Sequence, residues 1–513
     1  MNKAFRLTGP AQVGRSVFDL SYDKKMTCDM GQLIPSLCEE VVPGDVFDIS
    51  AETVIRFQPM VAPILHEIHA TIHYFFVPYR LLWDKWEEFI TGGVDGEFSE
   101  EIPRWEPSQG KNTIGSLWDY IGLPTGVDPE GAYPIVFPKR AYNLIFNEYY
   151  RDQNLIDEID IDQEDIKNRA WEKDYFSSAL PWQQRGIAPA LPVTITGTSF
   201  AEFTRDSEIT QAPTAATLIG ANTSLEQTPQ LRTGNSDATI RRNMIDNMFG
   251  AMTRQNEIDG TNFDATTFNV ADLRLAFQIQ RWMERNARAG ARYTEFLKSH
   301  FGVSPKDERL DRPEYCGGTK TSVIVSEVLQ TSSTDQTTPQ GNLAGHGISA
   351  SSQQACKYRV QEFGVIMGIF SVVPRTAYQQ GIDRQWLRRT RYDFYSPEFA
   401  HLSEQAIEQA EILATDTEAD NTKIFGYQGR YDEMRVKRSM VCGQMRDTFD
   451  YWHLGRIFDP QDPPELNEDF VTCIPDKRIF AVPGEPGLIV NIGNNVKAVR
   501  PLPAMSQPGF IDH

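Results

Sequence analysis

The chain has 513 residues, a formal net charge of −20 and a hydrophobic content of 40%. This acidic average argues against a free nucleic-acid binder, because non-specific affinity for phosphates comes from clustered Lys and Arg. The longest apolar run, residues 365–373, is too short to cross a bilayer, and the N-terminal residues lack the apolar stretch of a signal peptide. We therefore expect a soluble chain without a standard export signal.

The six cysteines lie far apart in the chain and form no CxxC pair. This spacing argues against a disulfide framework and against a structural zinc site, so we expect reduced, buried thiols. Counted in blocks of fifty, only residues 251–300 and 351–400 carry more basic than acidic side chains. Any contact with nucleic acid should therefore be local.

The first part of the chain combines strands and helices. Residues 40–57 and 64–77 are rich in Val, Ile, Thr and aromatic residues, which predicts two strands. Residues 78–90 place apolar side chains on one side and precede Gly92-Gly93, so we predict a helix that ends at these glycines. A second helix is expected at residues 140–155.

The longest predicted helix opens the second part of the chain. Asn269 can cap its free backbone N–H groups, with Asp272 three residues later. The helical pattern continues to about Ala289, and Gly290 should end or bend the helix.

A strand and a polar loop follow this helix. Turns are expected at Arg312-Pro313 and Gly317-Gly318, and the β-branched residues of 319–328 predict a strand. From Gln330 to Gly347 the chain consists mainly of Ser, Thr, Gln, Asn and Gly, which cannot bury apolar surface. Further strands are predicted at residues 358–373 and 478–500, the latter with hairpins around residues 483–486 and 493–495.

Strands that lie far apart in sequence, with long excursions between them, are typical of a jelly roll. We predict a mainly β fold, an antiparallel eight-stranded jelly-roll β-sandwich with long inserted loops and several helices. Residues 1–196 should hold an N-terminal arm and the first part of the sandwich, 197–268 a variable surface insertion, and 269–513 the long helix, the polar loop and the remaining strands. All three segments should belong to one domain overall.

Three local patterns suggest chemistry, and each fails on inspection. His66, His69 and His73 would share a face of a helix, but their surroundings favour a strand, which separates them. The acidic run 157–165 alternates carboxylates but lacks the glycine of a calcium loop. The segment 317–321 resembles the end of a phosphate-binding loop, yet it precedes a strand and has Thr319 where Gly is required. We assign no catalytic, cofactor-binding or metal-binding residue.

One basic cluster remains as a candidate contact surface. It alternates four arginines with aromatic side chains, a combination that can grip single-stranded DNA by phosphate pairing and base stacking. The same residue types also fill protein interfaces and cores, where Arg pairs with carboxylates. Both readings, DNA contact and inter-subunit or core packing, stay open for Arg384, Trp386, Arg388, Arg389, Arg391 and Tyr392.

Several segments resemble the major capsid proteins of microviruses, especially those of the gokushovirus-like branch. The similarity covers most of the chain outside residues 197–268. It rests on the block 312–347 and on these further stretches: Phe18-Asp19-Leu20 with Lys24-Lys25 and Thr27, His73 to Pro78, Phe89 to Gly93, Tyr142 to Tyr149, Arg292 to Glu295, Ser299 to Val303, Arg389 to Tyr395, and the terminal Pro508 to His513.

The resemblance implies a structural capsid protein that self-assembles into a T=1 icosahedral shell around a circular single-stranded DNA genome. It also implies a place in the virion, assembly in the host bacterial cytoplasm, a small basic internal DNA-binding protein, other virion or scaffolding proteins, and a host receptor met by the insertion 197–268. No enzymatic step is expected. The alternative from another class is a β-sandwich carbohydrate-binding protein or hydrolase, which the aromatic and acidic content would suit.

Overall fold

The computed structural model describes residues 14–94, 97–106, 112–187, 195–196, 264–265, 270–289, 292–304, 306–329 and 343–505. They belong to two units, one from the ranges Met1–Arg185 and Glu284–His513 and one from Gly186–Met283. Within these described ranges, no helix is both long and apolar enough to span a membrane.

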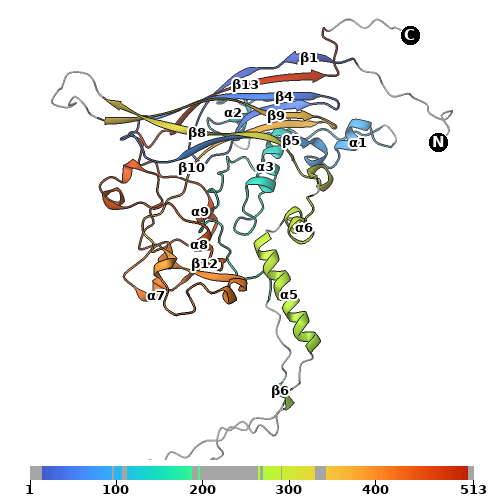
Figure 1. Ribbon diagram of the computed structural model, residues 1–513. Coiled ribbons are helices and arrows are strands. Elements are labelled where there is room, and N and C mark those ends of the chain that lie inside the picture. Colours follow the sequence, from blue (N-terminus) through green and yellow to red (C-terminus); the bar gives the residue numbers. More distant parts are fainter. Residues whose placement is uncertain are drawn as a thin grey trace, which may run out of the picture. The chain divides into compact units, whose positions relative to one another are not determined.

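Nine antiparallel strands form the main sheet (Figure 1). Their hydrogen-bonded order is β1-β13-β4-β9-β8-β5-β10-β3, and β2 also pairs with β13. The strands are β1 (Ser16–Asp19), β2 (Tyr22–Cys28), β3 (Ile34–Val41), β4 (Val46–Phe57), β5 (Ile68–Pro78), β8 (Glu314–Leu329), β9 (Leu343–Arg359), β10 (Gly364–Pro374) and β13 (Leu488–Arg500).

The pairing divides this sheet into two four-stranded halves with jelly-roll connectivity, β2-β13-β4-β9 and β3-β10-β5-β8. The halves join through β8 and β9, which pair at Gly317↔Cys356 and again from Ile324↔Ile348 to Leu329↔Leu343. The expected jelly-roll sandwich is confirmed. The main sheet has one strand more than the eight expected, because the short β1 extends the edge beside β13.

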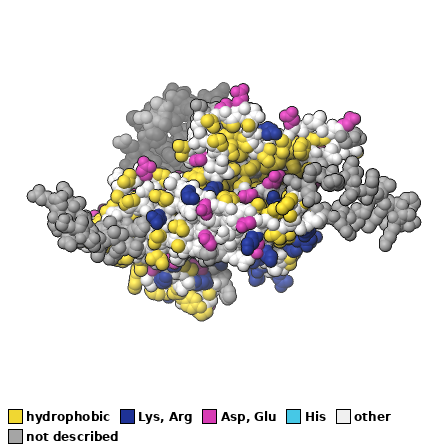
Figure 2. Space-filling view, turned by 90° about the horizontal axis from the view of Figure 1, so that it is seen from above, with side chains coloured by type: hydrophobic (Ala, Val, Ile, Leu, Met, Phe, Trp, Pro, Cys, Tyr) yellow, Lys and Arg dark blue, Asp and Glu magenta, His cyan; other side chains and the backbone are white. Residues whose placement is uncertain are grey.

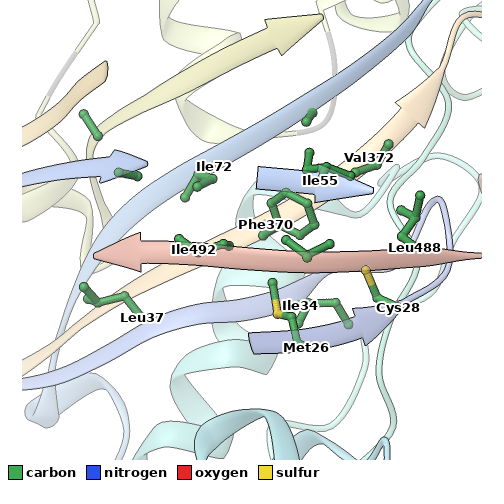
Figure 3. Packing of buried hydrophobic residues seen from close by; sticks show 14 of the residues in the cluster. Met26, Cys28, Ile34, Leu37, Ile55, Ile72, Phe370, Val372, Leu488 and Ile492 are labelled. Atoms are coloured by element: carbon green, nitrogen blue, oxygen red, sulfur yellow. The ribbon is translucent and has the colours of Figure 1, made fainter. Parts of the chain in front are cut away.

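A hydrophobic core fills the space between the two halves (Figure 3). Strands β4 and β13 show why the sequence forms this layer, since their side chains alternate between buried and more exposed positions. The side chains in the core come from both halves of the sheet: Met26, Cys28, Ile34, Leu37, Ile55, Ile72, Phe370, Val372, Leu488 and Ile492.

Strand β10 is buried along its whole length because both of its faces are covered. Phe370 and Val372 face the sandwich core, whereas Val365, Met367 and Ile369 belong to a second hydrophobic cluster. That second cluster includes α3 (Phe137–Ile145), which continues as a π-helical turn (Phe146–Tyr150), and α2 (Leu117–Ile121). Strands β3, β10 and β5 are thus packed against a helical layer on the side away from the sandwich core.

Apolar, acidic and basic side chains are interspersed on the face of the molecule that Figure 2 shows. On β4 and β13 the outward side chains include Glu52, Val54, Arg56, Ile489 and Lys497. This mixture agrees with the alternation of the two strands, whose other side chains face the core.

The remaining elements lie in the long connections. Two further sheets have two strands each, β6 (Ile195–Thr196) with β7 (Asp264–Ala265), and β11 (Glu404–Glu408) with β12 (Ile424–Gly429). The other α-helices of the described residues are α1 (Trp86–Thr91), α5 (Val270–Ala289), α6 (Tyr293–Phe301), α7 (Glu418–Asn421), α8 (Asp432–Arg435) and α9 (Glu468–Val471).

Several predicted boundaries were wrong. The strand predicted at 40–57 is split by a turn between β3 and β4, where Val42 N–H donates to Asp45. The strand predicted at 358–373 is the end of β9, a turn and then β10, and the turn is fixed by Val360 N–H donating to the Asp45 carbonyl. A hairpin at 493–495 is absent, since β13 runs without interruption through these residues.

Predictions for the helices and the polar loop were partly right. The helix predicted at 78–90 is a 3-10 turn (Tyr79–Leu81) followed by α1, whose end at the left-handed Gly92 is confirmed. Helix α5 has the predicted extent, although its expected cap Asn269 lies outside the described residues. Residues 343–347 of the expected loop belong to β9, and residues 330–342 lie outside the described residues.

The turn expected at Gly317-Gly318 is instead a β-bulge inside β8, since the register against β5 shifts there. All six cysteines are free thiols. Their predicted burial holds for Cys28, Cys356 and Cys473 but is wrong for Cys442, which is exposed.

Candidate inter-subunit or nucleic-acid interface

The predicted basic cluster lies in the long connection between β10 and β13. It begins with a 3-10 turn (Arg384–Trp386) capped by Asp383, whose carboxylate accepts the backbone N–H of Gln385. The turn and the loop after it lie beside β11, the 3-10 turn that follows β11 (Gln409–Glu411) and α8, which supply the carboxylates described below. A third hydrophobic cluster, with Ile407, Ile412, Phe425 and Phe470 among its members, supports these elements.

Arg384 is held inside the chain by a buried carboxylate. Its Nη1 lies 2.9 Å from Glu411 Oε1, and the Tyr175 hydroxyl donates to the other carboxylate oxygen at 3.1 Å. Burial raises the pKa of the Glu411 carboxyl, and the adjacent Arg384 charge opposes that rise. Glu408 lies 3.7 Å from the same guanidinium nitrogen.

Arg388 and Arg389 also pair with carboxylates, but the two ion pairs differ in how deeply they are buried. Arg388 Nη2 lies 3.2 Å from Glu433 Oε1, and these side chains are only 7% and 5% exposed. Arg389 forms a two-pronged contact with Glu408 at 2.6 and 3.1 Å but stays largely in solvent. Three of the four arginine charges are therefore already neutralised within the chain.

The exposed part of the cluster is mainly aromatic. The Arg391 guanidinium lies 4.7 Å from the centre of the Tyr392 ring, and it forms no ion pair with a carboxylate of the described residues. Trp386 is 74% exposed. We call the exposed set the aromatic–arginine surface; it consists of Trp386, Arg391, Tyr392, Phe394 and Tyr395.

This surface is chemically able to do two things. Exposed rings gain free energy when they are removed from water against apolar side chains, and an arginine stacked on a ring adapts to such an interface. The same rings could stack on nucleic-acid bases, with Arg391 on a phosphate. Whether this surface contacts a neighbouring subunit or DNA stays a prediction.

No local pattern in the sequence indicates the carboxylates that hold the arginines. Glu408, Glu411 and Glu433 follow their arginine partners by 19, 27 and 45 residues. Only the folding of β11, its following 3-10 turn and α8 against the 384–393 loop brings them together.

The three weaker patterns have separate structural roles. His66 contacts the Arg375 carbonyl, His69 lies 3.1 Å from Glu67, and His73 contacts the Tyr150 hydroxyl at 2.8 Å. In the acidic run, Asp162 accepts two hydrogen bonds from Arg140 of α3 at 2.9 and 2.8 Å. No group of three or more metal-ligating side chains occurs in the part of the chain that the structure describes.

The segment 317–321 also differs from a phosphate-binding loop, because it lies within β8. There, Lys320 pairs with Glu172 at 2.8 Å.

Comparisons with known proteins agree over almost the whole length. A family model described as capsid protein (F protein) matches residues 9–510. The chain is 34% identical to capsid protein VP1 of Chlamydia phage 1, over 99% of this chain and 98% of that protein. It is 34% identical to capsid protein VP1 of Bdellovibrio phage phiMH2K (96% and 95% covered) and 28% identical to that of Spiroplasma virus 4 (97% and 96% covered).

Proposed function

Because this chain belongs to the capsid protein (F protein) family of microviruses, we propose that its copies close into a T=1 icosahedral shell around a circular single-stranded DNA genome. The chain is a structural protein of the virion and not an enzyme. Family membership thereby overturns the alternative of a carbohydrate-binding protein or hydrolase.

The observation that supports a closed shell is a rigid sandwich whose long connections are free to make contacts. Its two halves enclose one core, while the connection between β10 and β13 carries the aromatic–arginine surface. Closed symmetry repeats one such contact many times, so a modest interface is sufficient in each copy.

We favour a second copy of the chain as the occupant of the aromatic–arginine surface. Affinity for DNA phosphates depends on basic charges that are free to release counterions. Arg384, Arg388 and Arg389 are already neutralised by carboxylates, which leaves mainly exposed rings and Arg391. At this surface, burying the rings against a neighbouring subunit offers a larger gain in free energy than pairing Arg391 with a phosphate.

A separate basic partner is proposed for the packaged DNA. With a net charge of −20, the chain cannot by itself neutralise a genome, so a small basic internal protein should accompany it.

We also propose that assembly takes place in the host bacterial cytoplasm, with other virion or scaffolding proteins as further partners. Segment 197–268, most of which lies outside the described residues, is proposed as the insertion that meets the host surface. Unchanged adsorption after deletion of its tip would remove that role.

Electron microscopy of the purified chain, alone and recovered from particles, tests the shell. Small isometric shells of uniform size are expected, filled with nuclease-protected DNA only when the other viral proteins are present. A monomer from both sources, with no shell under any condition, would contradict the proposal.

The contact surface has its own test. Trp386→Ala and Tyr395→Ala should lower the yield of shells, whereas Phe301→Ala, which removes another exposed ring, should leave the yield unchanged. Normal assembly of both surface variants, together with weaker DNA retention, would favour the DNA reading instead.

A further inference from the structure

A cavity of about 710 Å³ opens beside the β3-β10-β5-β8 half-sheet, away from the aromatic–arginine surface. Its walls come from β5, the π-helical turn after α3, the loop 169–173, the start of α6 and the bulged end of β8. This volume is typical of sites for small organic ligands.

Two of the guanidinium groups that line the cavity have no carboxylate partner among the described residues. Among its acidic side chains, Asp152 is paired with Lys173, Glu172 with Lys320, and Glu295 with Arg292. Arg151 and Arg169 form no ion pair with any described carboxylate. The cavity therefore keeps an excess of positive charge in partly buried surroundings, where that charge is poorly screened.

Arg169 is fixed in place by neutral groups. Its Nη1 donates to the Thr71 hydroxyl at 2.9 Å and lies 3.4 Å from the Ser371 hydroxyl, on neighbouring strands β5 and β10. Hydroxyl oxygens orient the guanidinium without cancelling its charge. Burial, with a smaller effect of Arg169, lowers the pKa of His73 to about 4, so His73 adds no further charge near neutral pH.

Aromatic rings form another wall of the cavity. Tyr315 is 50% exposed, and its ring centre lies 5.6 Å from that of Phe75 and 5.9 Å from that of His73. Tyr150 also stacks on His73, with ring centres 6.0 Å apart. The rings brace one another, so the free face of Tyr315 is held ready for a planar ligand at little entropic cost.

We propose that this cavity binds a nucleotide unit, with the phosphate on Arg151 and Arg169 and the base against Tyr315. Guanidinium groups match phosphate oxygens in pairs, and aromatic side chains stack on any base. The shared chemistry is a phosphate ester that carries a nucleobase; the source is either the packaged strand or a free nucleotide. The inference rests on the proposed packaging function only for the first source.

Binding is measured with the nuclease-treated full chain and four probes: deoxyadenosine monophosphate, deoxyadenosine, inorganic phosphate and a short oligo(dT). Quenching of tryptophan fluorescence or calorimetry gives the dissociation constants. We expect the nucleotide to bind at least tenfold more tightly than either phosphate or deoxyadenosine. Equal affinity for phosphate and the nucleotide would leave a plain anion site and overturn the proposal, as would equal affinity for deoxyadenosine.

Two variants localise the binding. Arg169→Gln keeps an N–H donor for the hydroxyls but removes the charge, and Tyr315→Ala removes the exposed ring; each should weaken nucleotide binding at least fivefold. The matched controls are Arg104→Gln, an exposed arginine that also lacks a carboxylate partner in the described residues, and Phe449→Ala, another exposed ring outside the cavity. Thermal melts verify folding, and unchanged binding in both folded cavity variants would refute the site.

The oligonucleotide separates the two sources. Binding of oligo(dT) that is lost in the cavity variants identifies a strand of single-stranded DNA as a ligand, whereas binding of the monophosphate alone identifies a free nucleotide. Shell formation is scored independently in the same samples. If shells form without nucleotide binding, the nucleotide site is refuted and the capsid function stands. If the nucleotide binds but no shells form, the shell proposal is refuted and the nucleotide site stands.

Discussion

Replacing Arg388 with Met should destabilise the chain by about 3–5 kcal/mol, because it leaves a buried carboxylate without its cation. The Arg388 and Glu433 side chains are 3.2 Å apart and almost completely buried. Gln405 Nε2, which donates to the other Glu433 oxygen at 2.7 Å, would be its remaining side-chain donor among the described residues. The loss corresponds to roughly two to four orders of magnitude in the ratio of folded to unfolded chain.

Arg389→Met is the matched control. Arg389 also pairs with a carboxylate, Glu408, but its side chain is 57% exposed, so its loss should cost less than about 1 kcal/mol. Urea unfolding of unassembled chain, followed by tryptophan fluorescence, compares the midpoints. The double variant Arg388→Met with Glu433→Leu should recover much of the stability, because an apolar pair replaces the ionic one. Equal midpoints for the Arg388 and Arg389 variants would refute the reasoning.

Three further predictions concern the sandwich and its surroundings. Phe370→Ala should cost about 3–5 kcal/mol in unfolding free energy, since the ring is fully buried between the half-sheets; a loss below about 1 kcal/mol would contradict that packing. Gly317→Ala should lower the melting temperature, because φ is +143° and an added Cβ would overlap the Ala355 carbonyl oxygen, whereas Gly484→Ala meets no atom and should melt as the parent does. His73, whose pKa is about 4 in the fold against about 6.5 unfolded, stabilises the chain above pH 6.5, and this stability is lost as the pH falls from 6.5 towards 4. His73→Gln should therefore reduce the acid-induced loss of unfolding free energy, followed by urea unfolding, by up to about 3 kcal/mol. An identical pH profile would count against a buried neutral histidine.

The sequence allowed the fold class to be predicted because several strands carry a clear signal. Strand β5 ends one residue beyond the predicted segment 64–77 and is rich in Ile, Thr and aromatic residues. The turn residues Gly92-Gly93 also gave the end of α1 correctly, since a left-handed conformation is required there. The order of the strands in the sheet was not predicted, because the periodicity of single strands does not indicate their partners.

Tertiary contacts explain what the sequence did not reveal. The residues Gly493-Asn494-Asn495 favour a turn, yet Asn494 is fully buried and donates to the Ser36 carbonyl of β3 at 3.1 Å. A contact with a strand more than 450 residues away thus overrides the local preference. Likewise, the role of Arg384 and Arg388 depends on carboxylates from β11, its following turn and α8, and no spacing in the sequence indicates such pairs.

The burial of β10 on both faces limits how this chain can diverge. A strand at the surface of a sandwich usually has one row of side chains in water, where polar and apolar residues can replace each other at little cost. Strand β10 has no such row, so a change of size at Met367 disturbs the helical layer, and a change at Phe370 disturbs the sandwich. Substitutions that persist along β10 should therefore be exchanges between apolar residues of similar volume, accompanied by changes in α3 or in the opposite half-sheet.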